Sequence, residues 1–108
     1  MSFLLSSVFE NDSRLAACAG AEHDEIGLGE IGPHVLAIQF ALLSLTGGWI
    51  SGEELDATWF GPTTATLTLG YNAARRIFRP GFVGRPQPFI GRSTLESLDR
   101  EMIRLRIA

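Results

Sequence analysis

The chain has 108 residues, which is the length of one domain with a core of modest size. Apolar residues make up 45% of it and its mean hydropathy is +0.16, which excludes an intrinsically disordered chain. The net charge of −3 argues against a general nucleic-acid-binding protein, and no apolar run is long enough to span a membrane.

The N-terminal twelve residues contain a short apolar run without a basic stretch before it or a small-residue cleavage site after it. We therefore do not interpret them as a signal peptide. The expected location is cytoplasmic as synthesised, and delivery to the periplasm or the cell wall would need another route.

A short helix is predicted next. Asn11 or Asp12 caps it, and it runs to about Ala19 with Gly20 as its stop. The single cysteine, Cys18, excludes an internal disulfide and is expected to pack on the inner face of this helix with Leu15.

Residues 20–32 are glycine-rich and acidic and are predicted to form a loop. The cluster His23-Asp24-Glu25 raises the question of a metal site. Zinc needs at least three protein ligands, and the chain offers only one further histidine and one cysteine. A solvated acidic loop is the preferred interpretation, and we expect no metal and no cofactor.

The second helix begins at Pro33, whose fixed φ suits the first helical position, and runs to about Leu45 before Thr46-Gly47-Gly48. One apolar stripe follows the helical period, and further apolar residues widen it, so this helix is expected to be central. The stripe is Val35, Ile38, Leu42 and Leu45, widened by Leu36, Phe40 and Leu43.

A capping box at 51–54 predicts one further helical turn. The carboxylates of this turn, Glu53, Glu54 and Asp56, are expected to be a solvated cap. A long helix should then run from Pro62 to about Phe78. Its expected inner face is Leu67, Tyr71, Ala74 and Phe78.

Residues 79–90 hold three of the five prolines and predict an extended loop. A second capping box, Ser93-Thr94-Leu95-Glu96, is expected to open an amphipathic last helix. No segment carries a clean strand pattern, so the expected fold class is all-α.

One short pattern occurs three times, with its glycines 29 and 30 residues apart. Each copy is an apolar residue, a glycine, a helix-starting residue and then a β-branched residue. The glycine permits a sharp turn and a close approach of the chain. The repeat therefore predicts three helices that are each entered through the same tight turn. The copies begin at Ile31, Phe60 and Ile90.

With these motifs the chain resembles the peptidoglycan-binding domain-like family over about residues 28–102. The residues that carry the resemblance are Gly32, Val35, Ile38, Gln39 and Leu42, then Phe60, Gly61, Pro62 and Thr64, and finally Phe89, Ile90, Gly91, Thr94, Leu95, Leu98 and Asp99. Leu67, Tyr71 and Asn72 stand where the family usually has Ala, Phe and Gln. Ala57-Thr58 and Gln87-Pro88 stand where it usually has Asp-Gly.

The resemblance implies a small three-helix bundle with pseudo-repeated halves, to which this chain adds an extra N-terminal helix. Residues 1–27 would be the extension and residues 28–108 the bundle. It also implies a noncatalytic binding module. The sequence itself favours no enzyme. No serine lies in a nucleophile-elbow pattern, and Glu53, Glu54 and Asp56 are crowded on one short segment, whereas a glycosidase needs two carboxylates that face each other across a cleft.

Six residues are candidates for ligand binding: Trp49, Trp59, Tyr71, Asn72, Arg75 and Arg79. Aromatic faces stack on sugar rings but also fill small cores, and a core or staple role is favoured for Trp59. The arginines suit a helix C-terminus without any ligand, yet they also suit carboxylates of a peptide stem or of an acidic protein. For Asn72, as for Gln39, hydrogen bonds to the turns are favoured over ligand contact.

Charge is unevenly distributed, since residues 1–60 carry nine acids and one arginine while residues 61–108 carry eight arginines and three acids. Either the two halves are complementary faces of one fold, or an anionic partner meets the arginine-rich end. Two functions follow as expectations. The first is binding of cell-wall peptidoglycan or a related glycan to target or anchor a partner. The second is a protein-interaction adaptor of a secretion or phage-like apparatus that keeps the fold without glycan binding.

Overall fold

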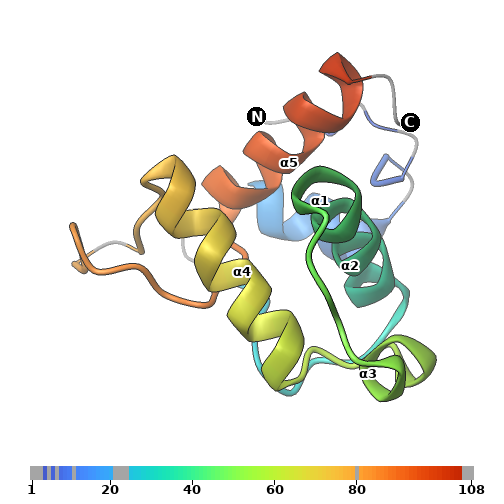
Figure 1. Cartoon of the computed structure of the whole chain (residues 1–108). Helices are drawn as coiled ribbons and strands as arrows, with labels where there is room; N and C mark the ends of the chain where they lie inside the picture. Colours follow the sequence, from blue (N-terminus) through green and yellow to red (C-terminus); the bar gives the residue numbers. More distant parts are fainter. Residues whose placement is uncertain are drawn as a thin grey trace.

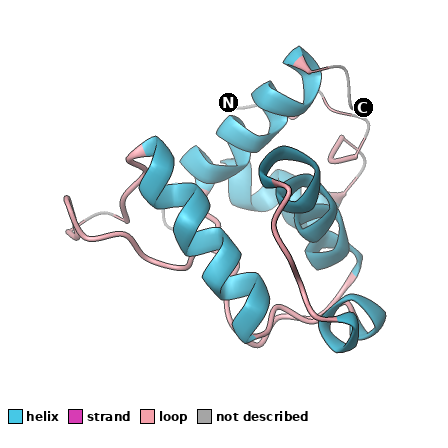
Figure 2. Ribbon diagram, in the orientation of Figure 1, coloured by secondary structure: helices cyan, strands magenta, loops and turns pink. Residues whose placement is uncertain are grey.

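The computed structural model describes residues 4, 6, 8–10, 12–20, 25–79 and 81–105. The described part of the chain contains five helices joined by loops and turns (Figures 1 and 2). They are α1 (Ser13–Gly20), α2 (Pro33–Thr46), α3 (Gly52–Ala57), α4 (Pro62–Arg75) and α5 (Arg92–Arg104). Extended pairing in this part is limited to two isolated bridges, Ile26 with Ile90 and Ile31 with Trp59. The prediction of an all-α bundle is confirmed.

The core lies where α1, α2, α4 and α5 meet, and α5 contacts both α1 and α2. Ile38 and Leu42 of α2 and Leu98 of α5 are fully buried there. The N-terminal extension contributes to the same cluster through Leu15 and Cys18, as expected for its inner face. The extension and the bundle therefore share one core.

The repeated glycine turn has the same backbone geometry in its second and third copies. Gly61 has φ −102° and ψ −167°, and Gly91 has φ −106° and ψ −171°. The first copy differs, because Gly32 has φ 148°, a value in the region that favours glycine. The expectation of three identical turns is therefore confirmed for two copies and wrong for the first.

Side-chain amides from the preceding helices fix these two turns in parallel ways. Gln39 donates from Nε2 to the carbonyl of Trp59 at 3.0 Å and to Oγ1 of Thr64 at 3.1 Å. Asn72 donates from Nδ2 to the carbonyl of Phe89 at 2.8 Å and accepts from Oγ1 of Thr94 at 3.0 Å. The predicted role of both amides in the turns is confirmed.

Helix α4 departs from the prediction in its length and in its buried face. It ends at Arg75 rather than near Phe78, because Arg76 adopts a left-handed conformation with φ 55°. Of the expected inner face, Tyr71 is buried but Ala74 is exposed. The buried residues of α4 are Thr64, Ala65, Thr68, Tyr71 and Asn72.

Two smaller expectations also need correction. Helix α5 begins at Arg92 with Gly91 as its N-cap, so Ser93 does not cap it. Helix α2 is less enclosed than its composition suggests, because Leu36 and Phe40 are 45% and 46% exposed. The stripe formed by Val35, Ile38 and Leu42 is buried as predicted.

Candidate binding groove

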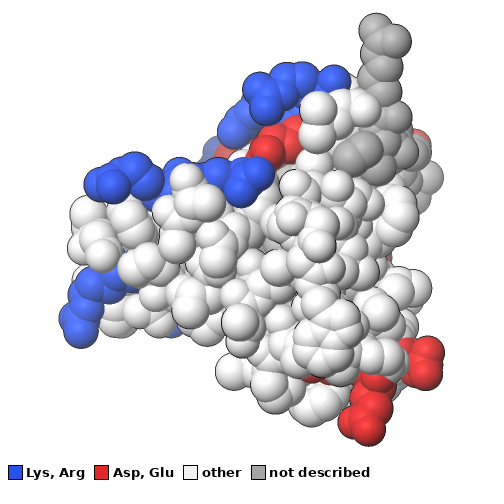
Figure 3. All heavy atoms as spheres, viewed as in Figure 1, with Lys and Arg blue, Asp and Glu red and all other residues white. Residues whose placement is uncertain are grey.

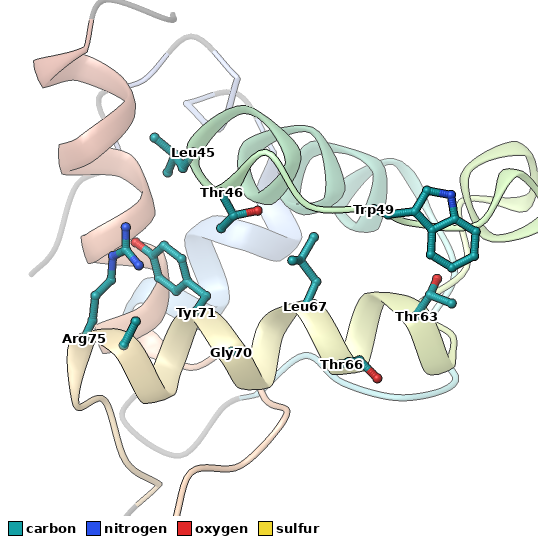
Figure 4. Close-up of a pocket in the computed structure, with 10 residues that line it drawn as sticks. Leu45, Thr46, Trp49, Thr63, Thr66, Leu67, Gly70, Tyr71 and Arg75 are labelled. Atoms are coloured by element: carbon teal, nitrogen blue, oxygen red, sulfur yellow. The ribbon is translucent and has the colours of Figure 1, made fainter.

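A groove of about 600 Å³ lies between the C-terminal end of α2 and the exposed side of α4 (Figure 4). Its walls are mainly apolar. The lining residues are Leu45, Thr46, Trp49, Thr63, Thr66, Leu67, Gly70, Tyr71, Ala74 and Arg75.

Trp49 forms one end of the groove, where its indole stands opposite Thr63 near the start of α4 (Figure 4). The indole is 69% exposed, so the ring offers most of its surface to solvent. The chain before it passes close to α4, since a Cβ on Gly48 would lie 2.4 Å from Cδ1 of Leu67. Gly48 thus allows Trp49 to stand beside α4.

The other end of the groove is closed by Tyr71 and Arg75 of α4 together with Glu101 of α5. The Arg75 guanidinium lies 3.8 Å from the centre of the Tyr71 ring and donates from Nη2 to Oε1 of Glu101 at 2.7 Å. The Tyr71 hydroxyl also donates to Glu101. These contacts fix all three side chains. Arg75 therefore lines the groove while its guanidinium is already paired with the Glu101 carboxylate.

The charges at this end shift the pKa values of its groups in consistent directions. The hydrogen bond from Arg75 lowers the pKa of Glu101 to about 2, with a further contribution from Tyr71. Burial raises the pKa of Tyr71, and the Glu101 carboxylate raises it further. Tyr71 is therefore a neutral donor and Glu101 an anion throughout the physiological range.

Arg75 separates the groove from a second, more polar pocket of about 550 Å³ between α4 and α5. Arg100 and Arg104 of α5 line this pocket. Neither forms an ion pair with any residue that the structure describes.

Glu54 of α3 positions the start of α4, and sequence reasoning placed it wrongly in a solvated cap. Its side chain is buried, and its carboxylate accepts hydrogen bonds from the backbone amides of Gly61, Thr63 and Thr64 and from both threonine hydroxyls. It also accepts from the hydroxyl of Ser51, whose side chain caps α3 as the capping box predicts. One signal in the sequence pointed to this role. The first turn of a helix has backbone amides without partners, and Thr63 and Thr64 add two hydroxyl donors there, so an acceptor from elsewhere in the chain is needed.

The structure brings three of the six candidate residues together in the groove, namely Trp49, Tyr71 and Arg75. The other three lie elsewhere. Trp59 is half-buried and its carbonyl accepts from Gln39, while Asn72 is fully buried with its amide bonded to the 87–89 backbone.

Arg79 lies beyond the end of α4. Its guanidinium pairs with Glu25 at 3.0 Å and lies 5.2 Å from the centre of the Phe89 ring. This contact links the arginine-rich half of the chain to the acidic half. The other ion pairs of the described arginines remain within one half.

His23 and Asp24 of the acidic cluster lie outside the described residues. The described part of the chain contains no group of three or more His, Cys, Asp or Glu side chains arranged to hold a metal ion. Nor does any described helix have the length and apolar character needed to cross a membrane.

No family model, curated protein or solved structure matches this chain.

Proposed function

We propose that this chain is a noncatalytic binding module that holds a glycan of the cell-wall peptidoglycan type in the groove between α2 and α4. The observation that carries the proposal is the exposed indole of Trp49 at one end of an open, largely apolar groove. A sugar ring presents an apolar face to an aromatic ring and hydroxyls at its edge. Thr66 lines the same groove, and its hydroxyl, which donates to the carbonyl of Pro62, can still accept a hydrogen bond.

The geometry of the repeated turns supports the resemblance to the peptidoglycan-binding domain-like family. Gly61 and Gly91 share one backbone conformation, and an amide side chain reaches each turn. Thr58, which stands where that family usually has glycine, has φ 49°, in the left-handed region that glycine favours.

A noncatalytic role is supported by the positions of the carboxylates around the groove. Glu54 is bound by the first turn of α4, and Glu101 is held by Arg75 and Tyr71. The low pKa of about 2 of each makes both poor proton donors near neutral pH. Each of these acids therefore has a structural partner rather than a free path to a ligand.

The second candidate function is a protein-interaction adaptor, and the apolar character of the groove favours it. Leu45 and Leu67 line the groove, and the exposed Leu36 and Phe40 lie elsewhere on α2. An apolar side chain of a protein partner would bury area there as readily as a sugar face does. In both candidate functions Trp49 contacts the ligand, which is a glycan in the first and a protein in the second.

The test is co-sedimentation of the purified protein with insoluble peptidoglycan sacculi, using the Trp49→Ala variant and, as control, Phe40→Ala. Both changes remove an exposed aromatic ring, but only Trp49 lines the groove. We expect saturable binding that Trp49→Ala weakens about tenfold and Phe40→Ala leaves unchanged, because an exposed aromatic ring that stacks on a ligand contributes ~1–2 kcal/mol. Thermal melts check that both variants stay folded.

Absence of binding to sacculi at low and moderate salt would reject the glycan proposal. Binding that both variants retain in full would reject the groove as its site. In the first case, a partner whose capture depends on Trp49 would establish the adaptor function.

A further inference from the structure

The segment between α4 and α5 projects from the helices as a loop whose tip is shaped by two successive turns (Figure 1). The amide of Phe82 donates to the carbonyl of Arg79, and the amide of Arg85 donates to the carbonyl of Phe82, both at 2.9 Å. Gly81 and Gly84 have φ values of 88° and 83°, which only glycine adopts without strain. The tip is therefore a specified structure with its own hydrogen bonds.

The base of this loop is held firmly against the bundle. Asn72 donates to the carbonyls of Gln87 and Phe89, and the Phe89 side chain is buried. Near the start of the loop, the Arg79 guanidinium is paired with the carboxylate of Glu25. These contacts hold the two ends of the loop and leave its tip to face outward.

The tip presents apolar side chains to solvent. Val83 is 82% exposed and Phe82 is 37% exposed. Neither residue lines the groove between α2 and α4. Val83 therefore has little packing within the described chain. The Phe82 ring lies with its centre 5.9 Å from the Arg79 guanidinium and still leaves more than a third of its surface to solvent.

The sequence on both sides of these apolar residues is rich in arginine. Residues 57–95 contain five arginines and no Asp or Glu. Of these, Arg76 and Arg85 flank the tip in sequence, are exposed, and form no ion pair with any residue in the described ranges. In Figure 3 the projection appears as a white surface with arginine atoms above and below it; acidic atoms lie at the lower right and beside arginines at the upper centre.

We propose that this loop docks the protein on an anionic lipid surface. Arg76 and Arg85 bind phosphate groups of the lipid heads, and the side chains of Phe82 and Val83 enter the boundary between head groups and acyl chains. A lipid surface can bind both the arginines and the apolar side chains of the loop, because its layer of anionic head groups covers a layer of apolar acyl chains. A nucleic acid or another soluble polyanion uses the arginines alone. The proposal does not depend on the groove or its ligand.

The experiment is flotation of the whole protein with vesicles of phosphatidylcholine alone and of phosphatidylcholine mixed with phosphatidylglycerol. Two double variants test the loop, Phe82→Ser/Val83→Ser for its apolar tip and Arg76→Gln/Arg85→Gln for its charge. Their matched controls are Leu36→Ser/Phe40→Ser on α2 and Arg100→Gln/Arg104→Gln on α5, which change the same chemistry outside the loop.

We expect binding to the mixed vesicles, little binding to phosphatidylcholine alone, and a marked loss for both loop variants. Removal of two arginines should weaken binding about twenty-fivefold, because each basic residue near an anionic membrane contributes about fivefold. The control variants should bind within about twofold of the unchanged protein, a margin below the effect of one basic residue.

Three results would overturn the proposal. The first is no binding to mixed vesicles at low salt. The second is binding that the controls weaken as much as the loop variants do. The third is binding that needs the arginines but not Phe82 and Val83 and that a soluble polyanion abolishes, which would identify a general anion-binding patch. Circular dichroism of each variant excludes unfolding as the cause of a loss.

Discussion

Glu54 shows how a single buried acid can organise two helices. Burial by itself would raise the pKa of its carboxyl, but the hydrogen bonds from Thr63 and Thr64 outweigh burial and lower the pKa from 4.5 to about 2. The donors come from the first turn of α4, where backbone amides lack partners within the helix. Glu54 thus accepts hydrogen bonds from the first amides of α4, as an N-cap side chain does, although Glu54 itself belongs to α3.

We predict that Glu54→Gln lowers the free energy of unfolding by about 2 to 3 kcal/mol at neutral pH. The amide loses the negative charge, and its NH₂ group meets donors that need an acceptor. Because the folded pKa lies below the unfolded one, the stabilisation is complete above pH 4.5 and is lost as the pH falls towards 2.

Urea unfolding of both proteins at several pH values measures this difference. The gap between wild type and variant should narrow from pH 4.5 downward. A gap that stays constant down to pH 2 would show that the charge of Glu54 contributes nothing to stability.

At this scale the sequence predicts the small local roles better than the long-range ones. The cap at Ser51 and the amides of Gln39 and Asn72 follow from local spacing or from the repeat. The burial of Glu54 does not, because its partners lie seven to ten residues away at the start of another helix. Tyr71 likewise finds Glu101 thirty residues away, a pairing that only the packing of α4 on α5 creates.

At the scale of elements, glycine and proline place helix starts accurately. Pro33 and Pro62 begin α2 and α4 as expected. The predicted buried face of α4 was wrong, because the structure buries Thr64 and Thr68 on the side where apolar residues were expected. Their hydroxyls are satisfied locally, since Thr68 donates to the carbonyl of Thr64 at 2.8 Å and Thr64 donates to Glu54. A threonine satisfied in this way can face the core, and hydrophobic periodicity alone misses it.

Two glycines near α4 should respond in opposite directions to substitution by alanine. A Cβ on Gly61 would lie 2.7 Å from Cδ of Glu54, whereas a Cβ on Gly70 would meet nothing within 4 Å. We expect Gly61→Ala to destabilise the protein by about 2 kcal/mol through displacement of Glu54. Gly70→Ala should stabilise it by about 0.5 to 1 kcal/mol, because alanine is the better residue inside a helix.

Thermal melts of the two variants provide the measurement, with each serving as the other's control. If Gly61→Ala were as stable as wild type, the close contact between the turn and Glu54 would be unimportant.

At the scale of the whole molecule, the N-terminal extension belongs to the core of the bundle. Phe9, Leu15 and Ile26 are buried in one cluster with residues of α2 and α5. The backbone amide of Ser6 donates to the buried carboxylate of Asp99 at 2.7 Å, which ties the extension to α5 as well. The cap at Asn11 or Asp12 and the stop at Gly20 predict a helix here, and the extent of the resemblance makes it an addition to the bundle. The structure shows that this helix shares the core.

We therefore predict that Phe9→Ala destabilises the entire protein by about 3 to 5 kcal/mol, the usual effect of removing a buried aromatic ring. Unfolding followed by far-ultraviolet circular dichroism and by tryptophan fluorescence should keep one coincident transition. Because Trp49 and Trp59 lie outside the extension, separate transitions would show that residues 1–27 form an independent unit.

The fold class could be predicted from the sequence because the repeated turns and the helix signals agree with each other. The sequence could name residues of the groove but not their arrangement. Trp49 lies in the segment after α2, whereas Tyr71 and Arg75 belong to α4. Arg75 has its charge paired with Glu101, which follows from helix packing and not from local spacing. The sequence shows which residue types could bind a ligand, but only the tertiary contacts show which of these side chains are already paired within the protein.

The single cysteine gives the molecule an internal reporter. Cys18 lies on the buried side of α1 with no exposed surface, and its Sγ donates to the carbonyl of Ile90 at 3.5 Å. A thiol reagent can reach it only when α1 lifts away or the whole chain unfolds, so the rate of labelling measures how often that happens. The opening of α1 can thus be timed in the native protein without any engineered probe.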